Sequence, residues 1–444
     1  MGNIYRIQPT DEKNPTLLIH PDTASRLGIS RNKVIILTFG NLRIFADVRH
    51  NTEIPETELR MSSKLINDLH LPDYLEFEIH VTQNEIMLGP YIGMLMSKEN
   101  RKLTASFLEK MKIYVKAYNK LHGAVVIFAL DKIDTVGKLV EGYCYNPISR
   151  NFEKGIFPLP CSIYRSIGLS DHWKNYFLSV LGDRIFNNRY FNKWDMYQWF
   201  SGNLDLKARI PFTSVYKAPQ DVFDLLDKYG KVFIKPVSGL RGHGVMQVER
   251  ENGTYVFKYR ENGNNLRETL QSSDQAEEYI RNKFAHGRYL IQQAIELIQY
   301  KGGVVDFRCI MQKDQSREWG CKAIIGRYGE RDSVVSNISS GGRAFKIDKI
   351  NKIALPLSAE KIVHLDDEIS VFALQVCRAL DEYGLNCGTL GLDIGVDKKE
   401  NLWLIEINNR DPDPSIALNV HDWALYKSLK TGILLYAKSL AGFG

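Results

Sequence analysis

Apolar and polar residues over the first ninety positions form an internal repeat. The segment 17–47 aligns without gaps with 59–89, at a period of 42 residues. Each copy reads as a strand, a short helix and further strands with alternating apolar residues, and two such units can close a small barrel around shared apolar faces. The pattern predicts a duplicated, β-barrel-like domain of double-psi type over 1–95, with short helices over 22–27 and 64–69 and a role in docking or oligomerisation.

Residues 96–185 carry alternating helix and strand patterns, as in a small α/β domain. Helical spacing over 99–121 is followed by 124–130, a continuous apolar run that is typical of a buried parallel strand. Further elements are expected in the same region, namely strands over 138–145 and 157–164 and a helix over 172–181.

Residues 186–444 read as a larger α+β domain with polar residues at the strand ends. A helix is expected over 194–201, and a second begins at Pro219, because proline is favoured at the first helical position. The other elements expected are strands over 231–236, 289–295, 304–311 and 322–327, a helix over 366–383 and a hairpin over 391–409.

Lys235 ends an apolar strand and leads into a glycine-rich turn. The turn contains Gly239, Gly242 and Gly244. Glycines allow backbone N–H groups to approach a polyphosphate, and Lys235 and Arg241 supply positive charge. No Gly-Lys-Ser/Thr follows, so the turn is not a Walker loop. Glycine-rich turns between strands also occur for structural reasons, so this turn alone does not establish a phosphate site.

Arg308 lies in an otherwise apolar strand, where an unpaired charge would be costly. We therefore expect it to have an anionic partner. A salt bridge with Asp306 or another acid is one interpretation. The other is a bound phosphate, which arginine meets with two parallel hydrogen bonds.

Three oxygen-bearing side chains lie in the expected hairpin. If 398–401 forms a four-residue turn, Asp393 falls opposite Glu406, with Asn408 on the same face. Such oxygens suit Mg²⁺, which usually keeps some waters and is shared with substrate phosphates. Carboxylates in hairpins are also commonly solvated, so the triplet gains weight only together with the other motifs.

Composition narrows the class of protein. The 444 residues carry a formal net charge of +6, with basic and acidic residues interspersed, which does not favour a nucleic-acid partner but allows phosphate binding at one site. The six cysteines include no Cys-x-x-Cys pair, which favours buried reduced thiols over disulfides or zinc. Neither a signal peptide nor an apolar stretch of membrane-spanning length is found, so we expect a cytoplasmic protein with no membrane partner.

The order of these motifs resembles the ATP-grasp superfamily. The resemblance runs from about 186 to 420, and 306–342 is similar to amino-acid ligases that add glutamate to a ribosomal protein. The three-part layout of the whole chain resembles the YheC/YheD endospore coat-associated family. The fold implied is an ATP-grasp domain of two α+β lobes over 186–444, after a small α/β pre-ATP-grasp domain over 96–185.

The resemblance implies a role for each motif. ATP would lie between the lobes, with Lys193 and Lys235 on its α- and β-phosphates, the backbone at Gln293 and Ile295 at adenine, and Glu296 as a candidate for the ribose. The residues implied in ATP binding are Lys193, Lys235, Gly239, Arg241, Gly242, Gly244, Gln292, Gln293, Ile295 and Glu296. The metal ligands implied are Asp393, Glu406 and Asn408, for two Mg²⁺ ions or for Mn²⁺, and the catalytic residues are Arg308, Arg327 and Asn337.

The activity implied is an ATP- and Mg-dependent carboxylate–amine ligase that acts through an acylphosphate on an amino acid, a peptide or a wall-related substrate, in association with the endospore coat. The alternative is an ATP-binding structural or docking protein of the spore coat without ligase activity, which holds coat proteins through its N-terminal domain. Phosphoryl transfer to a hydroxyl is a third possibility for this fold. The retained phosphate and metal residues favour the ligase.

The segment after Asn408 departs from the family pattern, which commonly has small residues and Pro-Gly at this point. Here Asn409 to Pro414 are bulky and charged. Arg410 could hold a substrate carboxylate, and Asp411 or Asp413 an amine. Local ion pairs among these residues are the other interpretation.

Overall fold

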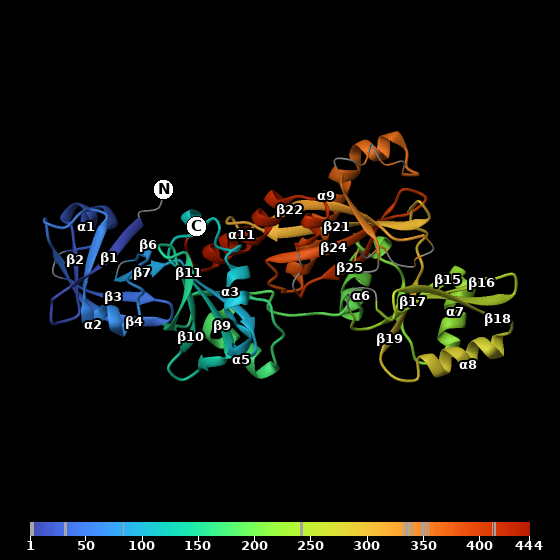
Figure 1. Cartoon of the computed structure of the whole chain (residues 1–444), viewed down its shortest axis with the longest axis horizontal. Helices are drawn as coiled ribbons and strands as arrows, with labels where there is room; N and C mark the ends of the chain where they lie inside the picture. The colour runs from blue at the N-terminus through green and yellow to red at the C-terminus, as the bar shows by residue number, and fades with distance from the viewer. Residues whose placement is uncertain are drawn as a thin grey trace.

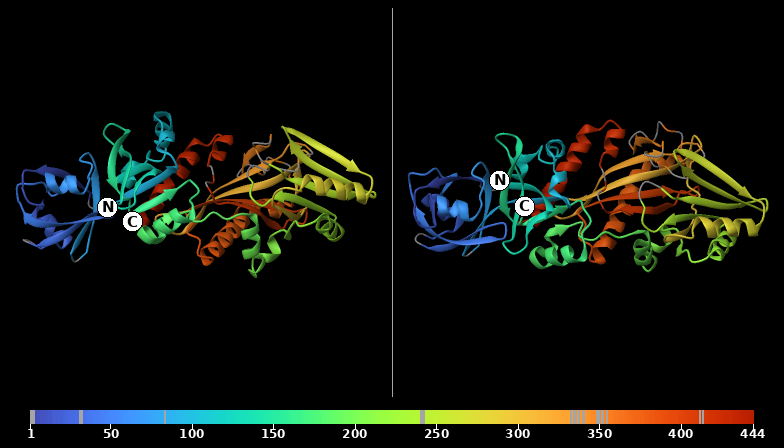
Figure 2. Two further views of the ribbon diagram at one scale, coloured as in Figure 1. Left: turned by 90° about the horizontal axis from the view of Figure 1, so that it is seen from below. Right: turned by 60° about the horizontal axis from the view of Figure 1, so that its bottom comes forward.

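The computed structural model describes residues 4–444 except 31–32, 83, 240–242, 332, 334–335, 337, 339–340, 348–349, 351–352, 354, 411 and 413. Figure 1 shows an elongated molecule in which a β-barrel, a middle sheet and a pair of further sheets follow one another along the long axis. The two views of Figure 2 show the same row of three parts. Among the helices described, none is long and apolar enough to cross a membrane.

The N-terminal part is a closed barrel with the strand order β1-β5-β2-β4-β3-β7-β6. Its elements are β1 (Ile4–Thr10), β2 (Thr16–Ile19), α1 (Pro21–Leu27), β3 (Val34–Phe39), β4 (Leu42–His50), β5 (Glu58–Ser62), α2 (Ser63–Asp68), β6 (Glu76–Val81) and β7 (Glu85–Gly89). Leu17 pairs with Met61 and Ile19 with Leu59 across β2 and β5. Leu17 is the repeat equivalent of Leu59, and Ile19 of Met61, so these strands meet as the two copies of a pseudo-two-fold repeat. The barrel agrees with the pattern, while its double-psi type stays a prediction.

The middle part is a mixed sheet with the order β11-β10-β9-β8-β12-β13. Its strands are β8 (Tyr91–Ser97), β9 (Ala124–Asp134), β10 (Leu139–Asn146), β11 (Asn151–Pro158), β12 (Ser162–Arg165) and β13 (Ile185–Phe186). The apolar run at 124–130 is a buried strand parallel to β8, as expected. The strand expected over 157–164 is wrong, because that range spans the end of β11 and the start of β12.

The helix expected over 99–121 is also wrong. The structure has α3 (Ala105–Met111) and α4 (Tyr118–Leu121), preceded by a short 3₁₀ turn. Between the helices, Tyr114 and Val115 donate backbone hydrogen bonds three residues back, to Met111 and Lys112. These tighter turns bury both side chains against the sheet. On the same sheet lie α5 (Asp171–Leu181) and the last helix, α11 (Trp423–Leu440).

The third part consists of two sheets, which we call the first and second lobes (Figure 1). The first lobe has the order β14-β19-β15-β16-β17-β18, with β14 (Thr213–Val215), β15 (Lys231–Pro236), β16 (Met246–Glu251), β17 (Thr254–Glu261), β18 (Asn264–Leu270) and β19 (Tyr289–Gln293). Its helices are α7 (Pro219–Tyr229) and α8 (Ser273–Lys283), and α6 (Lys193–Ser201) leads into it.

The second lobe has the order β23-β22-β21-β24-β25. Its strands are β21 (Gly303–Lys313), β22 (Trp319–Tyr328), β23 (Arg343–Lys346), β24 (Thr389–Val396) and β25 (Leu402–Asn408), and β20 (Gln299–Tyr300) pairs with β21. The long helix α9 (Ala359–Glu382) packs against β21 and β22, and α10 (Ile416–Asn419) follows β25. Apolar residues on one face of α9 and of the strands form one buried core. The other face of β24 and β25 is left to carry polar side chains.

The hairpin of β24 and β25 has the expected pairing of Asp393 with Glu406, but its loop and its register differ from those expected. Its loop, 397–401, has five residues instead of four, since Val396 pairs with Leu402. The register then shifts between Asp393 and Ile394, and Ile405 is left as the extra residue of a β-bulge. The bulge restores Asp393 to its place opposite Glu406.

Candidate functional site

A cleft lies between the two lobes and collects most of the residues singled out from the sequence. It is lined on the first-lobe side by Lys193, Lys231, Phe233, Lys235, Gly239, His243, Gln247, Gln292 and Gln293. The second lobe and the connecting segment contribute Ile295, Glu296, Leu297, Asp306, Ser336, Asp393, Lys398, Ile405 and Glu406. Residues from widely separated stretches of the chain thus meet at one place.

Asp393 and Glu406 line the second-lobe side of this cleft, and Asn408 lies beside them on the same hairpin. Asp393 and Glu406 are directly opposite each other on β24 and β25, and Asn408 pairs with Gly391 two residues along the same face. The Nδ2 atom of Asn408 is 3.5 Å from Oδ2 of Asp393. Carboxylate and amide oxygens on one face form a donor set that fits Mg²⁺ or Mn²⁺.

Two arginines hold the carboxylate of Asp393. Arg308 approaches with Nε at 2.5 Å from Oδ1 and Nη2 at 3.1 Å from Oδ2. Nη2 of Arg327 lies 3.1 Å from Oδ1 of the same carboxylate. The anionic partner expected for Arg308 is therefore an acid of the chain, Asp393 and not Asp306.

Asp306 pairs instead with Arg327, whose Nε and Nη2 donate to its two oxygens at 2.7 and 2.5 Å. Ser336 donates a further hydrogen bond of 2.6 Å to Asp306. The result is a network of two arginines and two aspartates in which each carboxylate meets more than one donor, and all of its members except the partly exposed Arg308 are buried.

Charged neighbours in this network shift the pKa values of Asp393 and Arg327. Burial alone would raise the pKa of Asp393, but Arg308 and Arg327 outweigh it, and the pKa is lowered. Burial would likewise lower the pKa of Arg327, but Asp306 and Asp393 raise it well above its ordinary value. Asp393 is therefore an anion and a potential metal ligand throughout the physiological range.

Lys193 and Lys235 approach the same region from the first lobe. Nζ of Lys193 lies 3.0 Å from Oε1 of Glu406 and donates to the carbonyl of Gly239 at 3.4 Å. Nζ of Lys235 donates to Oε1 of Gln292 at 2.5 Å, and Gln292 in turn donates to the hydroxyl of Thr213. Burial lowers the pKa of Lys235 to about 8, an effect that Glu406 opposes and Lys193 reinforces.

The glycine-rich turn is described only in part. Gly239 and Gly244 flank it, and Gly244 has a φ of +72°, which favours glycine. A Cβ at Gly244 would also lie 3.0 Å from Cγ of Pro236. Arg241 and Gly242, together with Asn337, lie outside the described residues.

Apolar side chains line part of the cleft, which we call its apolar end. Phe233, Ile295, Leu297 and Ile405 line it, and the β-bulge explains why Ile405 takes part. Successive residues of a regular strand face opposite sides, so Ile405 and Glu406 could not both reach one cleft without the extra residue. The backbone N–H of Gln293 already donates to Phe212, and the carbonyl of Ile295 accepts from Leu297.

Glu296 lies at the rim of the cleft, where the segment between the lobes meets the hairpin loop. Its carboxylate is 3.3 Å from Nζ of Lys398, and both side chains are exposed. The backbone N–H of Lys398 also donates to the Glu296 carbonyl. The carboxylate is thus accessible from the cleft, as its predicted contact with the ribose requires.

Asn409 is a positioning residue that the sequence analysis missed. Its buried amide donates to the carbonyl of Phe191 at 2.9 Å and accepts from the N–H of Phe191 at 3.4 Å. Phe191 lies two residues before Lys193, so Asn409 ties the segment that carries the lysine to the end of β25. Its position directly after Asn408 was the available signal.

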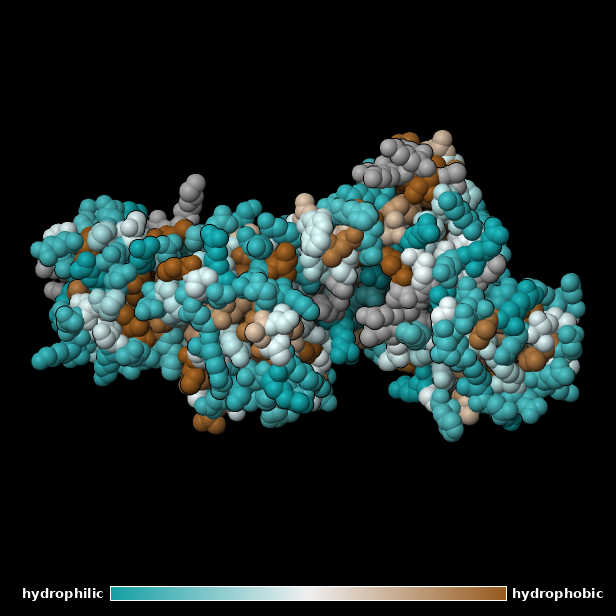
Figure 3. All heavy atoms as spheres, viewed as in Figure 1, coloured by the Kyte–Doolittle hydropathy of each residue, from teal (hydrophilic) through white to brown (hydrophobic). Residues whose placement is uncertain are grey.

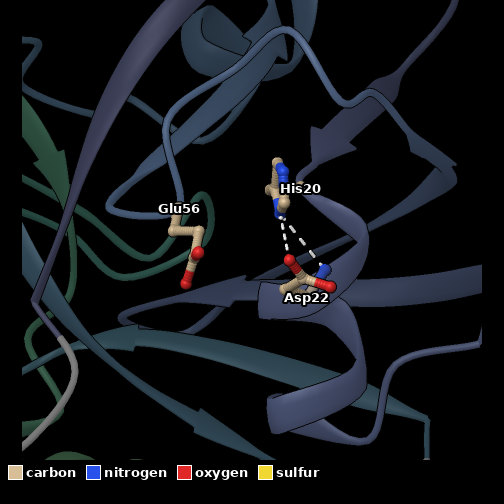
Figure 4. Close-up of side chains that lie close together, drawn as sticks. All are labelled: His20, Asp22 and Glu56. Carbon is tan, nitrogen blue, oxygen red and sulfur yellow. Dashed lines mark hydrogen bonds and ion pairs between the residues drawn. The ribbon is translucent and has the colours of Figure 1, made fainter.

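One further grouping of potential metal ligands occurs among the described residues, on the barrel. His20, Asp22 and Glu56 offer ligand atoms within 4.8 Å of one another. Figure 4 shows His20 interacting with Asp22, and Nδ1 of His20 accepts the Asp22 backbone N–H at the start of α1. Glu56 pairs with Arg26 at 3.0 Å. These contacts give the three side chains structural roles.

Comparison with known proteins finds relatives that cover most of the chain. A family model described as YheC/D like ATP-grasp matches residues 182–440. Endospore coat-associated protein YheD of Bacillus subtilis (strain 168) is 24% identical over 407 residues, covering 86% of this chain and 85% of YheD. Endospore coat-associated protein YheC of the same organism is 24% identical over 225 residues, covering 51% of this chain and 61% of YheC.

Solved structures of a synthetase and of a ligase show a more distant likeness. D-alanyl-alanine synthetase A from Vibrio cholerae superposes with a TM-score of 0.42 at 11% identity, over 77% of this chain and 98% of that one. VanG D-Ala:D-Ser ligase from Enterococcus faecalis gives a TM-score of 0.44 at 12% identity, over 79% and 98%. The family model itself spans more than half of the chain, and the chain therefore belongs to the YheC/D-like ATP-grasp family.

Proposed function

We propose that the protein is an ATP- and Mg-dependent ligase that joins a carboxylate to an amine through an acylphosphate. The observation that carries the proposal is the convergence of four cationic side chains on one hairpin with three oxygen ligands. Lys193 contacts Glu406, and Arg308 and Arg327 both contact Asp393. Lys235 lies in the same cleft, close enough for Glu406 to influence its pKa.

These residues suit phosphoryl transfer, which requires positioned positive charge and no covalent nucleophile. In the first step an oxygen of the substrate carboxylate bonds to the γ-phosphorus of ATP, the bond from that phosphorus to the β–γ bridging oxygen breaks, and ADP leaves. In the second step an amine nitrogen bonds to the acyl carbon, the carbon–oxygen bond to the phosphate breaks, and the amine gives up a proton. Arg308 and Arg327 would neutralise charge on the phosphoryl group.

Asp393, Glu406 and Asn408 would hold Mg²⁺, which screens the charge of the β- and γ-phosphates when bound. The carboxylate oxygens of Asp393 and Glu406 now face Arg308, Arg327 and Lys193, so the cations have to yield part of these contacts when metal binds. The apolar end of the cleft would take adenine, with Glu296 toward the ribose. A second ion and use of Mn²⁺ remain part of the proposal.

The relatives named for the endospore coat suggest where the protein works. We propose a cytoplasmic protein associated with the coat, acting on an amino acid, a peptide or a wall-related precursor, with the barrel as the part that docks to coat proteins. Large apolar side chains on the barrel, Val34 and Phe45, are more than half exposed. Figure 3 shows apolar patches between the polar side chains of the barrel and the middle part.

The test is release of ADP from MgATP by the purified chain, with and without pooled amino acids and peptides. We expect release that depends on the added substrates and is abolished in Glu406→Gln. The matched control is Glu318→Gln, because Glu318 is an exposed glutamate far along the β21–β22 hairpin with no ion pair to a described residue.

ATP binding without turnover under any addition would support the docking protein instead of the ligase. Transfer of the γ-phosphate to a stable hydroxyl ester, seen with radiolabelled ATP, would replace ligation by kinase chemistry. No ATP binding at all would contradict the assignment of the cleft.

A further inference from the structure

At the junction between the middle sheet and the second lobe lies a buried arginine that has no carboxylate partner in the part of the chain that the structure describes. Arg165 ends β12, has only 1% of its surface exposed, and donates to the backbone carbonyls of Asn187 and Ile167. Within the described part of the chain, no carboxylate lies within 4.0 Å of its guanidinium. Carbonyl oxygens satisfy its N–H groups but do not cancel its charge, and a buried charge without a counter-ion is costly.

A second guanidinium adds to this positive charge. Arg165 lies against the ring of Tyr190, with Cζ 4.0 Å from the ring centroid, and Arg410 lies against the same ring at 5.7 Å. Arg410 is exposed and forms no ion pair with any described residue. Burial is the main cause of a lowered pKa at Arg165, and Arg410 adds to it. Two like charges therefore share one aromatic ring.

Asn187, whose backbone carbonyl accepts from Arg165, adds an unpaired hydrogen-bond donor. The side chain of Asn187 is fully buried, and its Oδ1 accepts from the backbone N–H of Gly388. Its Nδ2 finds no hydrogen-bond partner among the described residues. An unpaired buried donor, together with two guanidinium groups that have no carboxylate partner among the described residues, favours a negatively charged guest.

The two arginines and the Tyr190 ring between them lie next to the proposed phosphate site. Arg410 follows Asn408 by two residues, and Asn409 binds the backbone of Phe191, next to Tyr190. A Cβ at Gly391 would lie 3.2 Å from Pro412 and 3.4 Å from Cδ of Arg308, so the segment after β25 passes beside the arginine that holds Asp393. Figure 1 shows the green segment between α5 and α6, which includes Tyr190, running from the middle part to the lobes.

We propose that this junction binds the free carboxylate of the amine substrate, so that the acceptor is an amino acid or a peptide and not a simple amine. Arg410 makes the contact, and Arg165 supplies a fixed positive charge behind the Tyr190 ring. The inference rests on the proposed ligase function, because it names the substrate of the second step. The acceptor's amine would then lie between the junction and the phosphates.

The experiment compares each protein amino acid with its carboxamide as acceptor. In the presence of MgATP, the rate at which phenylglyoxal modifies Arg410 is followed by peptide mass spectrometry, alongside ADP release. We expect free amino acids to slow modification of Arg410 and to stimulate ADP release, and carboxamides to do neither. Arg150, an exposed arginine of the β10–β11 turn, is the internal control and should react at one rate throughout.

Variants give a second measurement. Arg410→Gln should raise the KM for the amino acid by about 10- to 100-fold, the loss expected for a charge-assisted hydrogen bond. Arg410→Lys keeps the charge but loses the two-point contact, so its KM should fall between those of the unaltered chain and of Arg410→Gln. The KM of Arg150→Gln should equal that of the unaltered chain. Equal protection by amides, or unchanged KM in Arg410→Gln, would overturn the inference. Protection of Arg410 without turnover would support the carboxylate site and contradict the ligase function.

Discussion

Arg308 covers both carboxylate oxygens of Asp393, with nitrogen–oxygen distances of 2.5 and 3.1 Å. The side chain proposed to bind metal is therefore paired with the one proposed to stabilise the transferring phosphoryl group. Both groups cannot serve their proposed roles while they fully satisfy each other. Arg308 has to exchange part of its contact with Asp393 for the substrate phosphate.

Arg308→Gln should move metal binding and turnover in opposite directions. Without nucleotide, Mn²⁺ should bind about three- to tenfold more tightly, because a competing cation is gone from Asp393. Substrate-dependent ADP release should fall about 100-fold or more, because charge at the phosphoryl group is lost. Mn²⁺ binding is read by electron paramagnetic resonance. A parallel decline of both quantities would show instead that Arg308 only maintains the fold of the hairpin.

The affinity for ATP should weaken as the pH rises through about 8. Burial lowers the pKa of Lys235 to about 8, so its ammonium is present below that pH and is lost above it. ATP binds the charged form, and affinity should be about tenfold weaker at pH 9 than at pH 7. Equilibrium titration with a fluorescent ATP analogue checks the profile. Lys235→Arg stays charged over this range and should flatten it, and a profile that keeps its slope in this variant would assign the effect to another group.

Replacement of Asn409 by alanine should loosen the segment that carries Lys193. Two hydrogen bonds to the backbone of Phe191 would be lost at a buried position, at a cost of about 1–3 kcal/mol. Hydrogen exchange in the peptide around 187–195 should speed up accordingly, and ATP should bind more weakly. Asn119→Ala, at an exposed asparagine of the middle part, is the control. Unchanged exchange in Asn409→Ala would remove its positioning role.

Ile405→Ala should weaken ATP binding without disturbing the hairpin. The bulged residue lines the cleft, as Phe233 does, and its removal should cost about tenfold in affinity through lost apolar contact with the base. Isothermal titration measures this effect. The affinity for inorganic triphosphate, which lacks a base, should be the same in the variant and the unaltered chain, and an equal loss for both ligands would point to a damaged phosphate site.

Local patterns predicted those features of the fold that depend on periodicity. The repeat at 17–47 and 59–89 indicated the barrel, and the hairpin acids were placed opposite each other even though the loop and the bulge were both missed. One error compensated the other, since a loop longer by one residue requires an extra residue elsewhere to restore the pairing. The bulge brings Ile405 to the cleft, and no local pattern contains this placement.

Partners distant in sequence were harder to predict. Arg308 was expected to have an anionic partner, but its choice of Asp393 over the nearby Asp306 follows from the antiparallel pairing of β21 with β24. Side chains two apart on one strand share a face, so Asp306 was a plausible partner from the strand alone. The broken helix over 99–121 has a similar cause, because burial of Tyr114 and Val115 against the sheet decided its geometry.

The packing of α11 sets an order of events during synthesis. This helix covers β8 and β12, and Phe443 lies where any side chain at Gly89 would lie. A ribosome produces those strands long before it produces the helix, with both lobes in between. The middle sheet therefore waits, with one apolar face uncovered, until nearly the whole chain has been translated. Nascent chains stalled before residue 423 should be the ones that need protection by a chaperone.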